Sequence, residues 1–308
     1  MKSISVLIVT YNQEDVIRRT LDSVLVQKDF GLHKIVVSDD CSSDSTWSIL
    51  EEYRDKYPDY MDIHRNNPNL GIYPNMEKVV ELRPQSDLFY KLSGDDALCP
   101  HFFEEIQKLV ENRRIDTSRA VGLYFDWKSV QPNGKEYVFH QNMVEKVSSA
   151  FSLYLRGKAS IRSLAVSESV LANYKPVIKD RGLRLSEAMF DSQDHLLIED
   201  KYYCPYVATI YYAGIGVSQD LGKERSEYKT KQALETMEYL RDNVATDPMD
   251  KKWIDYKISR IYYSISPSWK GLFEVLNLYW RCNNRRYGIT LKERLLNYRT
   301  LYRILRNS

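Results

Sequence analysis

The chain has 308 residues, 43% of them hydrophobic and 28% charged, with a formal net charge of +2. It is long enough for one large or two modest domains with a buried core, and its composition is that of an ordinary soluble globular protein. Four scattered cysteines, Cys41, Cys99, Cys204 and Cys282, form no Cys-X-X-Cys pair, which argues against a disulfide framework or a zinc site and fits a reducing compartment.

Apolar runs alternate with helical periodicities along the first hundred residues. Strands are predicted over residues 4–9, 34–38, 61–65 and 87–92, and helices over 14–27, 46–57, 74–82 and from near Pro100 onward. Repeated strand–helix alternation implies right-handed crossovers and a sheet covered by helices on both faces. The sequence therefore predicts an α/β fold with a doubly wound, mostly parallel sheet.

Polar loops follow three of these strands, at residues 10–12, 39–40 and 94–96. In such sheets ligands bind outside the carboxyl ends of the strands, where these loops converge. No GxGxxG follows the first strand and the chain contains no GxxxxGK[ST], which argues against a dinucleotide oxidoreductase and a P-loop nucleotidase. An acidic site that handles a nucleotide diphosphate needs Mn²⁺ or Mg²⁺ to bridge the like charges.

The third loop contains two adjacent carboxylates at the end of a buried strand. Gly94 lets the backbone turn sharply or lie close against a ligand. Asp95 and Asp96 repel each other, and a divalent cation would stabilise the pair. The alternative is that the pair caps the helix that starts near Pro100.

Four short motifs in register carry a family resemblance. They are Val-Thr-Tyr-Asn at 9–12, Asp-Asp-Cys-Ser-Ser-Asp at 39–44, Asn-Leu-Gly at 69–71 and Gly-Asp-Asp at 94–96. In this order and spacing they resemble a family 2 glycosyltransferase, over roughly residues 1–215. The resemblance implies a GT-A fold and the transfer of a sugar, with inversion, from a nucleotide-diphosphate sugar such as a UDP-sugar.

The resemblance also implies roles for individual residues. The nucleotide would be bound by Thr10, Tyr11, Asn12, Asp39, Asp40, Gly94 and Asp95, with Tyr11 beside the base. Asp95 would take the metal-binding place of the family's Asp-X-Asp motif, and Asp96 would be the second metal ligand. Ser93 stands where many members have the first Asp of that motif.

The catalytic base is expected farther along the chain. Inverting transfer needs a carboxylate that removes the proton of the acceptor hydroxyl. In the family this is commonly the Asp of a Glu-Asp pair that opens a helix, and Gln193-Asp194 before the Leu-rich residues 195–198 stands in that place. Asp194 is the candidate base and Asp191 the alternative, although an N-cap role is favoured for Asp191. We expect His195 to be a structural neighbour.

The segment between these motifs is less regular. A strand is predicted over 120–127, followed by a hairpin that reaches 138–140, and residues 151–172 show mixed helical patterns. That last stretch contains three basic residues, Arg156, Lys158 and Arg162. One interpretation is that they face a diphosphate or an acceptor, and the other is that they form a solvated basic face.

The C-terminal part has a different pattern. The uncharged segment 202–219 is interpreted as strands, since Pro and Gly interrupt it and a membrane span needs about 20 apolar residues. Helices are predicted over 231–243 and 250–264, then an apolar stripe (Trp269, Leu272, Phe273, Leu276, Trp280) and a second one over 291–305. Residues 267–308 contain nine Lys/Arg and two Glu. Either these basic helices bind an anionic membrane surface or they pack on the catalytic domain.

These patterns predict a catalytic domain over residues 1–218 and a helical extension over 219–308. The first strand leaves no room for a signal peptide, so we expect a cytoplasmic protein, with the tail as a peripheral attachment to the inner face of the membrane. The leading hypothesis is a metal-dependent hexosyltransferase in surface polysaccharide synthesis, with a saccharide or lipid-linked acceptor and no nucleic acid partner. The alternatives are a non-catalytic nucleotide-sugar or carbohydrate-binding member of the fold, and a nucleotidyltransferase, which would be expected to have a glycine- and Arg/Lys-containing loop after the first strand.

Overall fold

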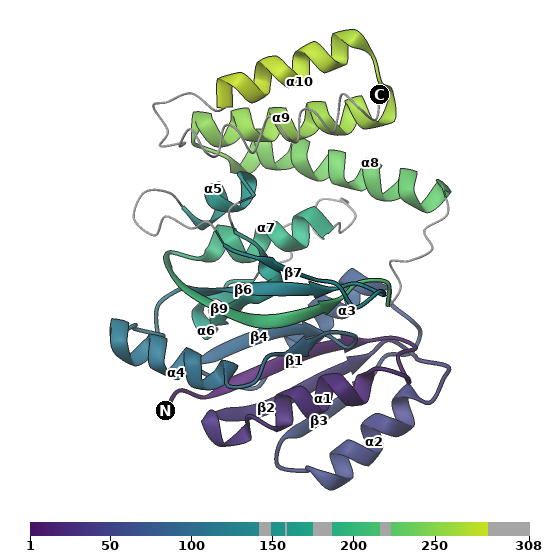
Figure 1. The fold of residues 1–308 in the computed structure, drawn as a ribbon, viewed down its shortest axis with the longest axis vertical. Coiled ribbons are helices and arrows are strands. Elements are labelled where there is room, and N and C mark those ends of the chain that lie inside the picture. Colours follow the sequence, from purple (N-terminus) through teal and green to yellow (C-terminus); the bar gives the residue numbers. More distant parts are fainter. Residues whose placement is uncertain (142–148, 158, 175–186, 216–222, 283–308) are drawn as a thin grey trace. The chain divides into compact units, whose positions relative to one another are not determined.

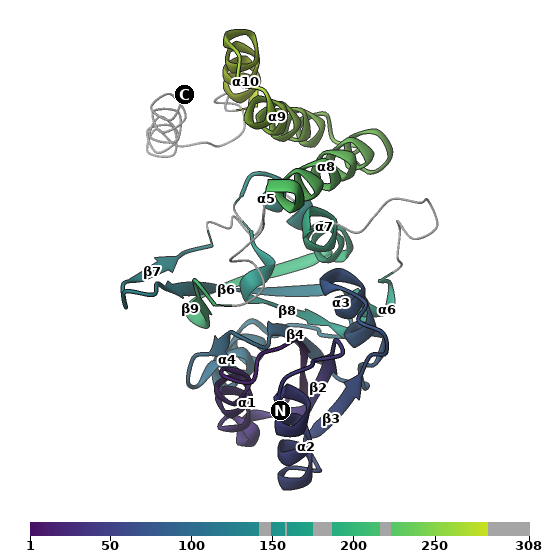
Figure 2. The same cartoon turned by 90° about the vertical axis from the view of Figure 1, so that its right-hand side faces the viewer.

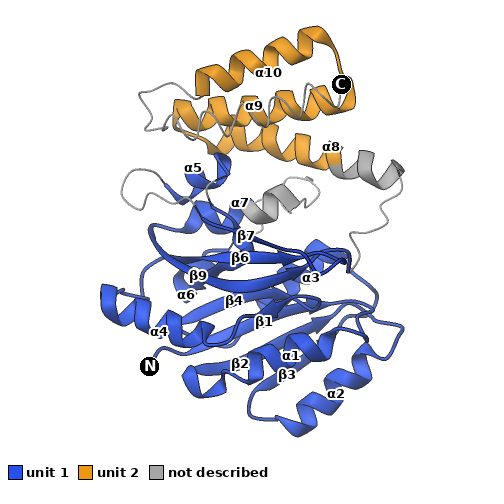
Figure 3. Cartoon of the chain, viewed as in Figure 1, with its two compact units in different colours: residues 1–223 blue, residues 224–308 orange. Residues whose placement is uncertain are grey.

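The computed structural model describes residues 1–141, 149–157, 159–174, 187–215 and 223–282. The chain forms two compact units, Met1–Lys223 and Glu224–Ser308 (Figure 3).

One mixed sheet organises the first unit (Figure 1). Its strands are β1 (Ile4–Thr10), β2 (Leu32–Asp39), β3 (Met61–Arg65), β4 (Leu88–Ser93), β5 (Ala97–Leu98), β6 (Val121–Val130), β7 (Glu136–Phe139), β8 (Leu164–Ser167) and β9 (Asp200–Tyr212). Their order is β3-β2-β1-β4-β8-β6-β9-β5, with β7 paired to β6. The first four strands in this order are parallel, β8 is antiparallel to β4 and β6, and β9 is parallel to β6. The predicted parallel-dominated α/β sheet is confirmed.

Helices cover both faces of this sheet (Figure 2). They are α1 (Ile17–Leu25), α2 (Thr46–Lys56), α3 (Ile72–Glu81), α4 (Phe102–Arg113), α5 (Ala150–Leu155), α6 (Glu168–Ala172) and α7 (Glu187–Leu197). α1, α2 and α4 pack on one face of the sheet, and α3, α5 and α6 pack on the other. The central strands are therefore buried on both sides, which is why they appear in the sequence as continuous apolar runs.

The alternation of side chains along β1 illustrates this arrangement. Ile4, Val6 and Ile8 join the core under α1, α2 and α4, whereas Leu7 joins the core on the opposite face. Successive side chains of a strand point to opposite faces, so a single run supplies both cores. β1 ends at Thr10, and the first polar loop begins there.

Three elements differ from their prediction. The first helix begins at Ile17 and not at residue 14. The stretch 151–172 was predicted as mixed helix. It contains, in chain order, most of α5, a 3₁₀ turn (Ile161–Ser163), β8 and α6. α7 begins at Glu187, so the prediction that Asp194 opens a helix is wrong. The uncharged segment that begins at residue 202 is strand up to Tyr212, as predicted.

The second unit is helical in its described part. It contains α8 (Lys223–Tyr239), a π-helical turn (Leu240–Val244), α9 (Pro248–Ile265) and α10 (Trp269–Cys282). The Asp247 side chain caps α9 by accepting a hydrogen bond from Met249 N (2.6 Å), with Pro248 at the first helical position. None of the helices formed by the described residues is both long and apolar enough to cross a bilayer.

The predicted single stripe on α10 is in fact divided between two faces. Leu272 is buried, together with Val275, whereas Trp269, Phe273 and Trp280 are 69–79% exposed. Since a helix has 3.6 residues per turn, positions three and four apart can lie on either side of a contact line. The second predicted stripe, residues 291–305, lies outside the described residues.

Candidate active site

The three polar loops meet at the carboxyl ends of β1, β2 and β4. Asp40 N donates to Thr10 O (2.9 Å), and Gly94 N donates to Val9 O (2.9 Å). A Cβ atom at Gly94 would lie 2.3 Å from Gln13 Oε1 and 3.0 Å from Thr10 Oγ1. A larger residue here would require the side chains of Gln13 and Thr10 to shift, so glycine suits this close approach of the third loop to the first.

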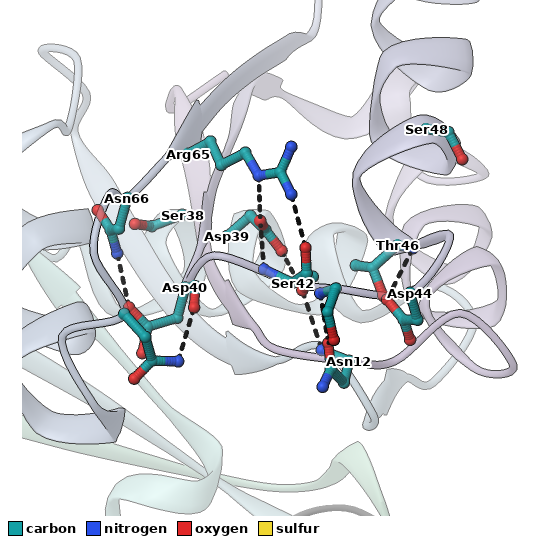
Figure 4. A network of polar contacts seen from close by, with 12 residues as sticks. Asn12, Ser38, Asp39, Asp40, Ser42, Asp44, Thr46, Ser48, Arg65 and Asn66 are labelled. Atoms are coloured by element: carbon teal, nitrogen blue, oxygen red, sulfur yellow. Dashed lines mark hydrogen bonds and ion pairs between the residues drawn. The ribbon is translucent and has the colours of Figure 1, made fainter.

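Asp39 is the last residue of β2, and its carboxylate is fully buried (Figure 4). Ser42 donates to it from its hydroxyl and from its backbone N–H (3.1 Å), and Arg65 Nε lies 3.5 Å from Asp39 Oδ2. Burial raises the pKa of Asp39 above its ordinary value, while the Ser42 hydrogen bonds and the charge of Arg65 oppose this shift. The carboxylate is thus a rigid acceptor at the base of the loop.

Asp40 joins two of the motifs (Figure 4). Its carboxylate accepts hydrogen bonds from Asn66 Nδ2 (3.0 Å), Leu70 N (2.8 Å) and Gly71 N (2.8 Å). Its backbone carbonyl accepts another from Asn69 Nδ2 (2.7 Å). These contacts hold the loop at residues 66–71 against the end of β2, so in this structure Asp40 positions the loop.

The first loop is fixed by Asn12 and leaves Tyr11 exposed. Asn12 has a positive φ of 49°, a conformation that Asn tolerates better than most residues. Its N–H donates to Ser42 Oγ (2.9 Å), and its Oδ1 accepts from Ser43 N (2.8 Å). Tyr11 therefore extends from a well-anchored backbone, which suits a ring that stacks on a ligand.

Asp95 and Asp96 form an adjacent carboxylate pair in the turn between β4 and β5. Asp96 is only 8% exposed, and its Oδ1 has no hydrogen-bond partner among the described residues. Burial, and then the charge of Asp95, raises the pKa of Asp96 to about 7. Burial also raises the pKa of Asp95. The Thr20 hydroxyl fixes the turn through the carbonyls of Gly94 (2.8 Å) and Asp96 (2.6 Å).

This pair fits a divalent cation. The alternative role as a helix cap is excluded, because His101 occupies the N-cap position of α4. A buried carboxylate oxygen without a partner, next to a second carboxylate, is an oxygen-rich site of the kind that Mn²⁺ and Mg²⁺ prefer. No cluster of three or more His, Cys, Asp or Glu side chains suited to a metal occurs in the described part of the chain, so a bound ion would need further ligands from substrate or water.

Two arginines lie near this pair. Arg19 Nη2 donates to Asp95 O (2.6 Å), and its guanidinium lies 3.6 Å from the centroid of the Tyr212 ring. The positive charges of Arg19 and Arg162 act on both carboxylates and lower their pKa values against the effect of burial. Arg162 was one of three basic residues singled out in the sequence, whereas Lys158 lies outside the described residues.

Sequence reasoning misses Arg19, because its spacing places it on the polar face of the first helix. The available signal was its neighbour Thr20, a polar residue within the apolar stripe formed by Ile17, Leu21 and Val24. A buried hydroxyl needs a hydrogen-bond partner, and this one bonds to the turn that carries Asp95.

Asp194 lies in the last turn of α7 and is 0% exposed. Lys91 Nζ of β4 lies 2.5 Å from Asp194 Oδ2, while Oδ1 has no partner among the described residues. Lys91 stands four residues before Asp95, so this ion pair ties α7 to the strand that carries the carboxylate pair. A lysine in a buried strand needs a partner, and that signal was available in the sequence.

The neighbours of Asp194 have different settings. His195 packs against the rings of Tyr124 and Tyr154, with centroid distances of 5.7 and 4.9 Å. Burial, and then the charge of Asp194, raises the pKa of Tyr124 well above its ordinary value. Asp191 is the fifth residue of α7, so the prediction that it is the N-cap is wrong, and its side chain lies outside the described residues.

Comparison with known proteins gives relatives that share parts of this chain. Abequosyltransferase RfbV of Salmonella typhimurium is 30% identical over 111 residues, which are 36% of this chain and 33% of that protein. The aligned segments span only 26–33% of the length of the curated relatives.

Solved structures share the fold at low sequence identity. S. aureus TarS in complex with UDP-GlcNAc matches with a TM-score of 0.62 at 14% identity, over 90% of this chain and 79% of that one. GalNAc-T7 with UDP, GalNAc and Mn²⁺ matches with a TM-score of 0.55 at 14% identity, over 92% of this chain and 55% of that one. The fold is therefore the GT-A fold implied by the resemblance.

The family model described as "Glycosyl transferase family 2" matches residues 5–162. This segment is more than half of the chain and contains the three loops, the carboxylate pair and Arg162. The protein belongs to glycosyl transferase family 2.

Proposed function

We propose that this protein is an inverting glycosyltransferase that moves a sugar from a nucleotide-diphosphate sugar to a hydroxyl of a saccharide or lipid-linked acceptor in surface polysaccharide synthesis. The observation that carries the proposal is the adjacent pair Asp95–Asp96 at the point where the polar loops meet, in which Asp96 is buried and its Oδ1 has no partner among the described residues. Family membership, the UDP-GlcNAc bound to TarS and the activity in the name of RfbV support it. UDP-sugars are the donors to test first.

Asp95 and Asp96 would hold a Mn²⁺ or Mg²⁺ ion, and the Mn²⁺ in the GalNAc-T7 structure supports this part of the proposal. When bound, the ion supplies positive charge that stabilises the leaving nucleotide diphosphate. Arg162, which is exposed and acts on both carboxylates, adds a second positive charge to the same region. A protein acid is then not required for departure of the leaving group.

Asp194 is the proposed base. Lys91 pairs with Oδ2, and Oδ1, the oxygen without a partner among the described residues, would accept the proton of the attacking hydroxyl. Because Asp194 is buried in this conformation, the side chains over Oδ1 must move aside when the acceptor binds. Attack from the side opposite to the leaving diphosphate then inverts the anomeric carbon.

The first test is hydrolysis of UDP-sugars without an acceptor, with and without Mn²⁺. A transferase is expected to release UDP slowly and only in the presence of the metal. Binding of nucleotide-sugar with no hydrolysis and no transfer would instead favour a non-catalytic binding protein, which the burial of Asp194 and the serine at position 93 also favour.

The nucleoside is proposed to lie beside Tyr11, with Asp39 at the base of its pocket. We predict that Asp39→Ala weakens UDP binding by roughly tenfold or more, because the loss leaves Ser42 and Arg65 without their buried acceptor. Isothermal calorimetry with UDP and Mn²⁺ measures the effect. Asp40→Ala is also expected to weaken binding, through displacement of the loop at residues 66–71.

Asp44→Ala is the matched control. Asp44 belongs to the same loop, but its carboxylate accepts hydrogen bonds from Thr46 N (2.9 Å), at the start of α2, and from Glu14 N (3.1 Å), in the segment before α1. Its loss is expected to lower stability and to leave UDP affinity nearly unchanged. If Asp39→Ala and Asp40→Ala both bind UDP as the wild type does, the loop has only a structural role.

The C-terminal helices are proposed to attach the enzyme to an anionic membrane surface. Trp269, Phe273 and Trp280 are exposed on one face of α10, and residues 267–308 carry a net charge of +7. Tryptophan is favoured at the membrane interface, and each basic residue near an anionic surface contributes about 1 kcal/mol.

We predict that deletion of residues 267–308 reduces binding to phosphatidylserine-containing vesicles in a flotation assay, and that added salt weakens binding of the full chain. The double variant Trp269→Ala/Trp280→Ala should lose much of the same binding without disturbing the buried face of α10. Val26→Ala, an exposed apolar residue of the first unit, serves as the control. If the full chain does not bind such vesicles at low salt, α10 has another role.

A further inference from the structure

A group of aromatic rings lies on β6, β7 and β9, outside the loops described above. Phe139 of β7 is directly opposite Trp127 of β6, and their rings stack with centroids 4.0 Å apart and planes 8° apart. Tyr211 of β9 meets Trp127 edge-on at 6.3 Å. The guanidinium of Arg162 lies over both, 5.4 Å from Trp127 and 4.4 Å from Tyr211. These four residues are called the aromatic platform.

The platform is held by a buried hydrogen-bond network. Asp126, only 1% exposed, accepts hydrogen bonds from Tyr203 OH (2.8 Å) and Gln141 N (2.9 Å), and lies 2.6 Å from His140 Nδ1. The Gln141 side chain in turn accepts from Ser160 N (3.0 Å) and donates to Ser160 O (3.3 Å). The β6–β7 hairpin is thus joined to the turn that carries the guanidinium, so the rings are fixed before any ligand binds.

The platform adjoins the carboxylate pair. Ala97, the residue after Asp96, pairs with Ile210 of β9, the residue before Tyr211. Arg162 extends over Trp127 and Tyr211, and its charge also acts on Asp95 and Asp96. The platform therefore begins next to the proposed diphosphate site and extends along the sheet to Phe139, which is 43% exposed.

The chemistry of this surface suits a sugar better than a purely apolar partner. The face of an aromatic ring is negative, so it attracts the weakly positive C–H face of a pyranose. The guanidinium donates up to five hydrogen bonds and suits hydroxyl oxygens. A flat ring beside fixed polar groups is the usual composition of a small-molecule site.

We propose that the aromatic platform binds the saccharide part of the acceptor, with a sugar ring against the exposed face of Phe139 and its hydroxyls hydrogen-bonded to Arg162. This assignment rests on the proposed glycosyltransferase function, because it is the position next to the carboxylate pair that makes the bound saccharide an acceptor.

The test is binding of a panel of methyl glycosides (glucoside, galactoside, mannoside, N-acetylglucosaminide and rhamnoside) to the full chain. Binding is measured by saturation-transfer NMR in the presence of UDP and Mn²⁺. At least one glycoside is expected to bind, and its affinity should fall roughly tenfold in Phe139→Ser and in Trp127→Leu. Val138→Ala is the matched control, since Val138 lies on the opposite face of β7 and is similarly exposed. It should bind like the wild type.

Calorimetry with UDP on the same proteins separates this proposal from the proposed function. Phe139→Ser should bind UDP normally, which also establishes that the variant is folded. The platform assignment is overturned if no glycoside binds to the wild type, or if Phe139→Ser binds it equally well; UDP binding and hydrolysis would then still support the transferase. If glycosides bind through Phe139 but the wild type binds neither UDP nor any other nucleoside diphosphate or its sugar, the platform is a saccharide site and the transferase function fails.

Discussion

Replacement of Asp95 by Asn is expected to lower the rate of sugar transfer by at least about 10²-fold while the protein remains folded. The amide keeps the size of the side chain but removes one of two negative charges from the proposed cation site. Weaker capture of the cation and weaker stabilisation of the leaving diphosphate both follow. The measurement is the transfer or hydrolysis rate over a titration of Mn²⁺, with circular dichroism as the check on folding.

Asp96→Asn is the informative companion. On folding, the pKa of the wild-type Asp96 carboxyl rises to about 7, because burial and then the charge of Asp95 destabilise its ionised form. A raised pKa stabilises the fold at low pH, and this contribution is lost as pH increases through about 7. Without metal, Asp96→Asn should therefore raise the free energy of unfolding at neutral pH. Mn²⁺ with UDP should stabilise the wild type more than either variant. A near wild-type rate for Asp95→Asn at low Mn²⁺ would refute the metal assignment.

Asp194→Asn is expected to bind UDP-sugar normally and to transfer sugar roughly 10²–10⁴ times more slowly, because a positioned base typically contributes that factor. A sugar hydroxyl is a poor nucleophile at neutral pH, and the amide cannot accept its proton. Rates of transfer are compared with donor affinities for Asp194→Asn and Asp191→Asn side by side. Loss of transfer only in Asp191→Asn would move the role there.

A second explanation for such a loss is structural, and the Lys91 ion pair allows it to be separated. Removing one partner of a buried pair costs about 3–5 kcal/mol, since the other charge stays buried and unpaired. The double variant Lys91→Met/Asp194→Asn removes both charges. Recovery of stability without recovery of transfer supports the base. Recovery of both would mean that Asp194 is structural, and normal transfer in Asp194→Asn and Asp191→Asn would remove this segment from the mechanism.

Much of the first unit was predictable from the sequence. The apolar runs of β1, β2 and β4 are short and contain β-branched or aromatic residues, which favours strands buried on both faces, and their alternation with helices favours parallel neighbours. Parallel strands end at the same edge of a sheet, so the polar loops that contain Thr10, Asp39 and Asp95 were expected to meet, and backbone hydrogen bonds between these segments join them.

Other features were decided by packing alone. β8 has four residues, too few to show a period, yet it lies between β4 and β6 because both offer unpaired edges to it. The helical period of α10 did not determine which of its apolar residues would be buried, since that depends on where its neighbour lies. Likewise, the pattern of charges along the chain did not determine which residue each buried charge would pair with.

The parallel strands and the polar loops after them were thus predictable, because they depend on local periodicity and on topological rules for parallel strands, and the family resemblance followed from the four motifs in register. The tertiary structure alone decided that Asp40 holds the loop at residues 66–71, that Lys91 pairs with Asp194 and that Arg162 lies over Trp127 and Tyr211. Each of these contacts joins segments that are distant in the chain. A buried charge is stabilised by the particular partner that packing brings to it, and no local pattern encodes which partner that is.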